Sequence, residues 1–151
     1  MIKDTIVFGG LAGAVGNILK ETMAWSLYFW GLIKYTFVHF CAGIVINPDT
    51  YVKDPLSVVV GIMIDFLIAA IFSLAMYLVM RRTGTDYWVI KGLGLGIFVF
   101  LICYGVLRPA ISIKIESSPF TALMYIFPNL TYGVATCWFL QKYGTFKVFW
   151  K

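Results

Sequence analysis

Five polar side chains stand inside stretches of sequence that are otherwise apolar, and their types could do chemistry. Asn17, Lys20 and Glu21 are spaced i, i+3 and i+4, so one face of a helix presents all three. Asp65 and Asn129 occupy later apolar stretches. An ammonium group enclosed with carboxylates can form an ion pair, exchange a proton or help to bind a cation. We take these five residues as the candidate substrate or ion site.

The candidate residues are also expected at one depth if the apolar stretches cross a membrane. The outer ends of three of these stretches fall near residues 30, 55 and 119. At about 1.5 Å of helix rise per residue, Lys20, Glu21, Asp65 and Asn129 lie about 15 Å below the outer boundary. A hydrocarbon core is roughly 30 Å thick, so we expect a polar cluster near its midplane.

The charges of this cluster do not balance. Lys20 supplies one positive charge, whereas Glu21 and Asp65 supply two negative charges when both are ionised. In a low-dielectric interior, either one carboxyl is protonated at neutral pH or a cation completes the site. Our hypothesis is that Lys20 pairs with Asp65 between the first and second spans, while Glu21 exchanges the proton or cation. The alternative is that the pair, with hydrogen bonds from Asn and Tyr side chains, only stabilises the fold.

Four further side chains are expected to support the cluster, namely Tyr28, Tyr104, Arg108 and Tyr132. Tyr28 shares the helical face of the first three candidate residues, and Tyr132 lies in the last apolar stretch. Tyr104 and Arg108 lie nearer the outer surface. In the second stretch, small residues stand at every fourth position in line with Asp65. In the third stretch, Gly92 and Gly96 are spaced in the same way. We therefore expect the helices to approach closely.

The composition indicates which elements must position these residues. Of the 151 residues, 61% are hydrophobic and 13% are charged, and the mean hydropathy is +0.89. These values lie well outside the range of soluble globular domains. They favour an integral membrane protein and argue against a soluble enzyme, a nucleic-acid-binding domain and a disordered chain.

Four stretches are long enough to cross a bilayer as helices, which takes about 20 mostly apolar residues. They cover about residues 5–30, 55–80, 88–108 and 119–141. Residues 32–46 carry Lys34 and His39 and are too few to span, so they predict a re-entrant or interfacial helix after a bend near Gly31. The predicted fold is all-α: a single polytopic membrane domain over residues 1–151, built as a four-helix bundle with that additional short helix.

Signals for helix boundaries agree with these ranges. Asp54-Pro55 and Ser118-Pro119 each place an N-cap residue before a proline at the first helical position. Gly144 is expected to end the fourth span.

The basic residues predict the orientation of the chain. The formal charge is +5, but Lys and Arg gather at the ends of the apolar stretches, so lipid headgroups and not nucleic acid are the expected contact. One side carries Lys3, Arg81, Arg82, Lys91, Lys142, Lys147 and Lys151, and the other carries Lys34, Lys53, Arg108 and Lys114. The first side has seven basic residues and the second has four. Since the cytoplasmic side of a membrane protein carries more Lys and Arg, this excess predicts that both termini lie in the cytoplasm. An alternative topology breaks the first span at Lys20-Glu21 and gives five spans, with the amino terminus outside.

No arrangement of residues typical of an enzyme occurs in the sequence. There is no nucleophile paired with a histidine, no HExxH motif, no aspartate pair with metal spacing and no phosphate-binding loop. Cys41, Cys103 and Cys137 lie in apolar stretches without CxxC spacing, and we expect them only to pack. His39 is the one histidine, and a haem held by two histidines would need a second chain. We therefore expect no enzymatic activity, no metal and no cofactor.

Two functions remain open. The first is a proton- or cation-linked transporter or channel-like protein, acting as a homo-oligomer because four short helices enclose little space. The second is a non-transporting structural or assembly subunit that docks a larger membrane partner. A small glycine-rich four-span chain with a buried Lys–Glu pair resembles, in composition, many prokaryotic inner-membrane proteins. The expected location is therefore the cell inner membrane, with the lipid bilayer as the surroundings.

Overall fold

The computed structural model describes residues 4–46, 54–111 and 118–144, and all regular structure within these ranges is helical. The elements are α1 (Thr5–Phe29), α2 (Phe37–Ala42), α4 (Pro55–Thr83), α5 (Trp88–Phe100), the π-helix η1 (Leu101–Leu107), α6 (Arg108–Ala110) and α7 (Pro119–Tyr143). The predicted all-α class is confirmed for these residues. The basic residues Lys3, Lys53, Lys114, Lys147 and Lys151, which the orientation prediction used, lie outside them.

The long helices follow the predicted ranges to within a few residues. α1 runs without interruption through Lys20 and Glu21, so the alternative topology with a break at that point is wrong. Asp54 and Ser118 are N-caps as predicted, because each side chain accepts a hydrogen bond from a backbone N–H of the first helical turn. Gly144 is the residue that caps the end of α7.

The third predicted span, 88–108, is not a single α-helix. After α5 the backbone widens into the turns of η1, and α6 follows directly. The physical reason is Pro109. A proline has no N–H, and in an α-helix its ring collides with the carbonyl four residues earlier, here that of Gly105. Wider π-helical turns before the proline relieve this collision.

The segment between α1 and α4 is less helical than predicted. Gly31 follows α1 with a φ of +72°, which confirms the bend expected there. Of the predicted helix at 32–46, only the six residues of α2 are helical. Thr36 precedes α2, and its backbone N–H donates a hydrogen bond to Nδ1 of His39 at 3.1 Å. Gly43 is the C-cap at the other end of α2.

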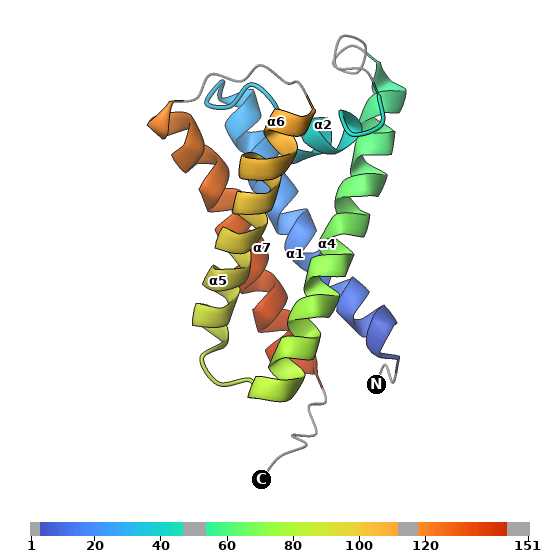
Figure 1. Ribbon diagram of the computed structural model, residues 1–151, viewed down its shortest axis with the longest axis vertical. Coiled ribbons are helices and arrows are strands. Elements are labelled where there is room, and N and C mark those ends of the chain that lie inside the picture. Colours follow the sequence, from blue (N-terminus) through green and yellow to red (C-terminus); the bar gives the residue numbers. More distant parts are fainter. Residues whose placement is uncertain (1–3, 47–53, 112–117, 145–151) are drawn as a thin grey trace.

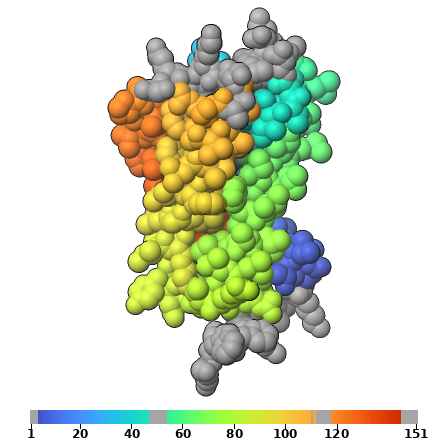
Figure 2. Space-filling model, in the orientation of Figure 1, coloured from blue at the N-terminus to red at the C-terminus, as the bar shows by residue number. Residues whose placement is uncertain are grey.

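α1 lies at the centre of the molecule, with α4 on one side and α7 on the other (Figure 1). α5 packs on α7, and α2 packs on α4. The start of α1, the end of α7 and the turn between α4 and α5 lie at one end of the molecule, which we call the turn end. α2 lies at the opposite end, which we call the α2 end. α4 and α5 cover the middle of the side shown in Figure 2. The ring of Phe72 on α4 packs against the ring of Phe98 on α5, with centroids 5.8 Å apart.

Glycines stand at the helix crossings. A Cβ atom at Gly13 would collide with the carbonyl of Ala69 on α4, and one at Gly16 with the carbonyl of Tyr132 on α7. Similar contacts with backbone are made by Gly92 and Gly96 of α5 against α7, and by Gly61 of α4 against Val38 of α2. The close approach of helices that the small residues predicted is therefore present.

Two helical segments in the described ranges are long and apolar enough to cross a membrane. They are Pro55–Thr83, with 29 residues, and Trp88–Leu107, with 20 residues. α1 and α7 do not meet this measure. The capacity of these two helices to span follows from their length and composition alone.

Candidate functional site

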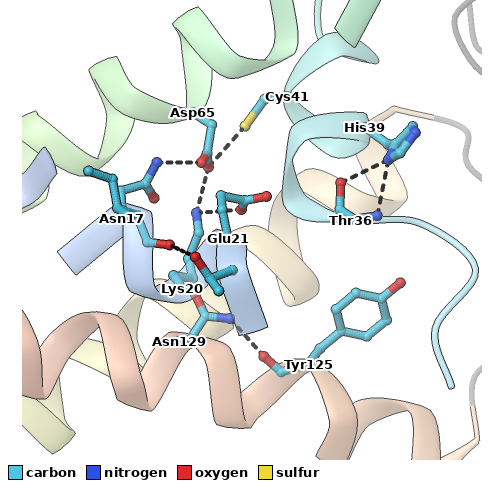
Figure 3. Close-up of polar contacts among 11 residues, drawn as sticks. Asn17, Lys20, Glu21, Thr36, His39, Cys41, Asp65, Tyr125 and Asn129 are labelled. Carbon is cyan, nitrogen blue, oxygen red and sulfur yellow. Dashed lines mark hydrogen bonds and ion pairs between the residues drawn. The ribbon is translucent and has the colours of Figure 1, made fainter. Parts of the chain in front are cut away.

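The charged cluster forms where α1 crosses α4. Nζ of Lys20 lies 2.6 Å from Oδ1 of Asp65, and only 3% of each residue is exposed. The contact of Gly13 with α4 brings the two helices together about two turns away along α1, so the side chains of Lys20 and Asp65 meet at their own level. The pairing predicted for these two residues is present (Figure 3).

Both oxygens of the Asp65 carboxylate have partners. Nδ2 of Asn17 donates a hydrogen bond to Oδ2 at 2.6 Å. Sγ of Cys41, on α2, lies 3.7 Å from Oδ1 and donates a weak hydrogen bond to it. Together with the ammonium group of Lys20, donors from two other helices surround this carboxylate. Its burial is therefore well compensated.

Glu21 is held less firmly than Asp65. Its Oε1 lies 3.4 Å from Nζ of Lys20. Neither carboxylate oxygen of Glu21 has a hydrogen-bond partner among the described residues, although only 8% of the residue is exposed. Because Glu21 and Asp65 contact the same Nζ, their carboxylates are close neighbours that share one ammonium group. The excess negative charge of the cluster therefore falls on the carboxyl with fewer partners.

The short helix α2 covers the charged cluster on the side that faces away from the turn end. The ring of Phe37 lies 4.8 Å from Nζ of Lys20, which is a cation–π contact. Cys41, one helical turn later, reaches Asp65. Phe37 and Cys41 were not among the residues predicted for the site. Their i, i+4 spacing was a signal that they share a face, but it could not show that this face turns toward Lys20 and Asp65.

A small cavity adjoins the cluster between α4 and η1. Its volume is about 10 Å³, which is close to the space that one water molecule needs. Its polar lining comes from Asn17, Lys20, Asp65 and Tyr132. Cys103 of η1 also lines the cavity, so this cysteine borders the site as well as packing against its neighbours.

Asn129 is hydrogen-bonded within its own helix, so the structure does not join it to the charged pair. Its Nδ2 donates to the carbonyl of Tyr125, one turn earlier in α7, at 2.8 Å. The backbone at Asn129 is packed against Gly96 of α5. These contacts assign Asn129 to the α5–α7 interface, while the other four candidate residues meet at the α1–α4 crossing.

The four supporting residues lie in two different places. Tyr132 borders the cavity. Tyr28 stacks on His39 with ring centroids 5.8 Å apart, and the guanidinium carbon of Arg108 lies 4.8 Å from the ring of Tyr104. Tyr28, Tyr104 and Arg108 therefore belong to an aromatic region toward the α2 end. Only Tyr132 is placed beside the charged cluster.

Within residues 4–46, 54–111 and 118–144, no group of three or more His, Cys, Asp or Glu side chains is placed to hold a metal ion. No family model, curated protein or solved structure matches the chain.

Proposed function

We propose that the protein is a multi-pass inner-membrane protein in which α1, α4, α5–η1 and α7 cross the bilayer as a four-helix bundle. Two of these segments have the length and composition to span. α4 also exposes a row of large apolar side chains, namely Leu56, Val59, Met63, Leu67 and Ile71. A soluble protein rarely exposes such a surface, whereas lipid acyl chains are its natural contact.

The polar residues of α1 are compatible with this location because they face the interior. Lys20, Glu21 and Asn17 are all buried against α4 and α2. At about 1.5 Å per residue, the 25 residues of α1 reach more than 30 Å, enough to cross the hydrocarbon core. The start of α1 and the end of α7 lie at the same end of the molecule, as four spans require (Figure 1). The proposed orientation places that end in the cytoplasm, following the excess of basic residues.

We further propose that the protein mediates proton-linked transport and that Glu21 is the group that takes up and releases the proton. The observation that carries this proposal is the inequality of the two carboxylates. Asp65 holds Lys20 at 2.6 Å and accepts a hydrogen bond from Asn17, whereas Glu21 shares the same ammonium group at 3.4 Å. A buried carboxyl with a spare negative charge and no other donor is suited to binding a proton.

The size of the cavity favours a proton as the coupling ion. A volume of about 10 Å³ leaves room for roughly one water molecule and not for a hydrated metal cation. A larger transported solute would need a path between copies of the chain, because four helices enclose little space. The proposed protein is therefore a homo-oligomer if it moves anything larger than a proton.

Proton flux into proteoliposomes under an imposed pH gradient tests this function. We expect the native chain to conduct protons. The proton flux of the Glu21→Gln variant should be lower by about tenfold or more, because the exchanging group is absent. Asp86→Asn is the matched control, since it neutralises an exposed carboxylate outside the cluster and should keep the native rate. Helix content and thermal stability in detergent verify that each variant is folded. No flux through the folded native chain, or equal flux in Glu21→Gln, would contradict the proposal.

A non-transporting subunit is the second candidate, and one observation favours it. The Lys20–Asp65 pair is enclosed and receives a further hydrogen bond from Asn17, as a purely structural ion pair would. Such a subunit would show no flux under any gradient. It would instead copurify with a larger membrane protein, and Glu21→Gln would leave that association intact.

A further inference from the structure

A groove on the surface of α7 lies between α1 and α5, which both pack on this helix. Leu19 of α1 stands at one side and Trp88 of α5 at the other, and the floor follows α7 from Leu130 to Trp138. The groove is open to the surroundings and has a volume of about 570 Å³. This volume lies within the range of roughly 300–1,000 Å³ that is typical of ligand sites.

The lining of the groove suits an acyl chain. Val134 and Ala135 on the floor are short beside the indole rings of Trp88 and Trp138, which is why the surface is hollow at this point. Thr131 also lines the groove, but its hydroxyl donates a hydrogen bond to the carbonyl four residues earlier at 3.1 Å. An apolar chain in the groove would therefore not leave this hydroxyl without a partner.

The groove follows only part of the length of α7. At 1.5 Å of rise per residue, the floor from Leu130 to Trp138 is about 12 Å long, whereas the hydrocarbon core of a bilayer is about 30 Å thick. The Trp138 end of the floor lies toward the turn end, where α7 ends. A helix of a second copy would need a surface that continues across the whole bilayer. One chain of a lipid in the leaflet at the turn end needs only the length that is present.

A lysine stands beside the groove on the side of the turn end. Lys142 follows Trp138 by one helical turn, and its Nζ lies 4.9 Å from the centre of the Trp138 ring. The side chain is exposed, and among the described residues it has no carboxylate partner. Lys91 of α5 is engaged instead, because its Nζ donates to the carbonyl of Gly84 at 2.8 Å. A positive charge without a counterion therefore lies where the headgroup of a lipid in the groove would be.

We propose that the groove binds one anionic phospholipid from the leaflet at the turn end, with an acyl chain along α7 and the phosphate group beside Lys142. Trp88 and Trp138 then lie near the level where chain and headgroup meet, which is the usual place of tryptophan in membrane proteins. The site is separate from proton transport and rests on the proposed membrane location. In the proposed orientation the turn end is cytoplasmic, and anionic lipids give that leaflet its negative surface potential.

Binding of phosphatidylglycerol to the lipid-free protein in detergent tests the site and does not depend on proton flux. Native mass spectrometry gives the affinity for the first bound lipid, and phosphatidylcholine with the same acyl chains is the comparison. We expect phosphatidylglycerol to bind about fivefold more tightly, which is the contribution of one lysine near an anionic headgroup. Lys142→Gln should remove this preference. Lys34→Gln is the matched control and should keep it, because Lys34 also lies over an aromatic ring, that of Tyr35, but away from the groove.

A second pair of variants tests the groove itself. Ala135→Leu adds a larger side chain to the floor and should weaken the binding of phosphatidylglycerol by about fivefold or more, because the chain loses its place. Ala75→Leu makes the same change at an exposed position of α4 outside the groove and should bind as the native chain does. Neither alanine is fully buried, so we expect both variants to fold, as circular dichroism in detergent would verify.

Equal affinity of the native chain for the two lipids, or an unchanged preference in Lys142→Gln, would overturn the site. A dimer of the lipid-free protein that Ala135→Leu dissociates would also overturn it, since a second copy would then be the occupant of the groove. These results leave the transport proposal standing, because proton flux is measured separately with Glu21→Gln. A preference that depends on Lys142 in a chain without proton flux would support the lipid site and contradict transport.

Discussion

The α1–α4 interface and the α5–α7 interface solve the same packing problem with different residues. In both, a glycine on one helix lies against the backbone of the other: Gly13 against Ala69 in the first, and Gly96 against Asn129 in the second. The α1–α4 interface also encloses the Lys20–Asp65 pair. The α5–α7 interface shows that close backbone contact holds two helices together without any such pair. Close packing of two helices therefore does not by itself require a charged pair, so the Lys20–Asp65 pair of the α1–α4 interface is open to another role.

The largest expected effect comes from breaking the charged interface on one side only. Lys20→Met removes the cation and leaves Glu21 and Asp65 buried together. Removing one partner of a buried ion pair typically destabilises a protein by about 3–5 kcal/mol, because the remaining charge is uncompensated. Thermal or denaturant unfolding in detergent, followed by circular dichroism, measures the loss.

The matched variant removes both charges. Lys20→Met combined with Asp65→Leu replaces the pair with apolar side chains and should regain most of the stability. If the double variant is as unstable as Lys20→Met, the pair contributes packing that apolar residues cannot supply, and the comparison with the α5–α7 interface fails.

A smaller effect is expected from breaking the interface that contains no charges. A Cβ atom at Gly96 would collide with the backbone of Asn129 and Leu130, so Gly96→Ala must push α5 away from α7. Overpacking of this kind costs about 1–3 kcal/mol, which the same unfolding measurement would detect.

Gly94→Ala is the control for this change, two residues away in the same helix. No atom lies within 4 Å of a Cβ placed at Gly94. Since alanine favours a helix over glycine by about 0.5–1 kcal/mol, Gly94→Ala should be neutral or slightly stabilising. Equal destabilisation by both substitutions would mean that α5 and α7 are not in close contact at Gly96.

The same comparison shows what sequence could predict. Helix boundaries at Asp54 and Ser118 were predictable because capping is local. The pairing of Lys20 with Asp65 was predictable because a buried cation needs a carboxylate, and counting residues placed both at one depth. Asn129 satisfied the same depth count, yet it bonds to Tyr125 in its own helix. Depth alone does not say which face of a helix a residue occupies.

Features that depend on contacts between distant segments were not predictable. The widening of η1 has a local cause in Pro109, but the placement of Cys103 beside the cavity requires α5 and α4 to be packed first. Phe37 reaches Lys20 only because α2 lies against α4. Apolar periodicity was no guide to these contacts, because lipid-facing and interior-facing residues are both apolar in such a chain.

The smallest expected effect is a pH dependence of the stability of α2, the helix that covers the charged cluster. Nδ1 of His39 accepts a hydrogen bond from the backbone N–H of Thr36 at 3.1 Å and lies 2.9 Å from the Thr36 hydroxyl. Burial lowers the pKa of His39, so the folded state favours the neutral ring. The stability that His39 contributes is therefore present above its unfolded pKa of about 6.5 and is lost as the pH falls through the lower folded value. Protonation also removes the acceptor that begins α2.

Amide hydrogen exchange at two pH values measures this effect, after correction for the intrinsic exchange rates. Between pH 7.5 and pH 5, the amides of α2 should lose protection, while those of α5 should not, because the α5–α7 contacts are made by glycines and backbone atoms. His39→Gln should remove the pH dependence of α2, since a glutamine amide does not titrate in this range. If α2 in His39→Gln still loses protection at pH 5, the titrating group lies elsewhere. Glu21, which lies beneath α2, would then be the group to replace, because its protonation would weaken the attraction that holds Lys20 under Phe37.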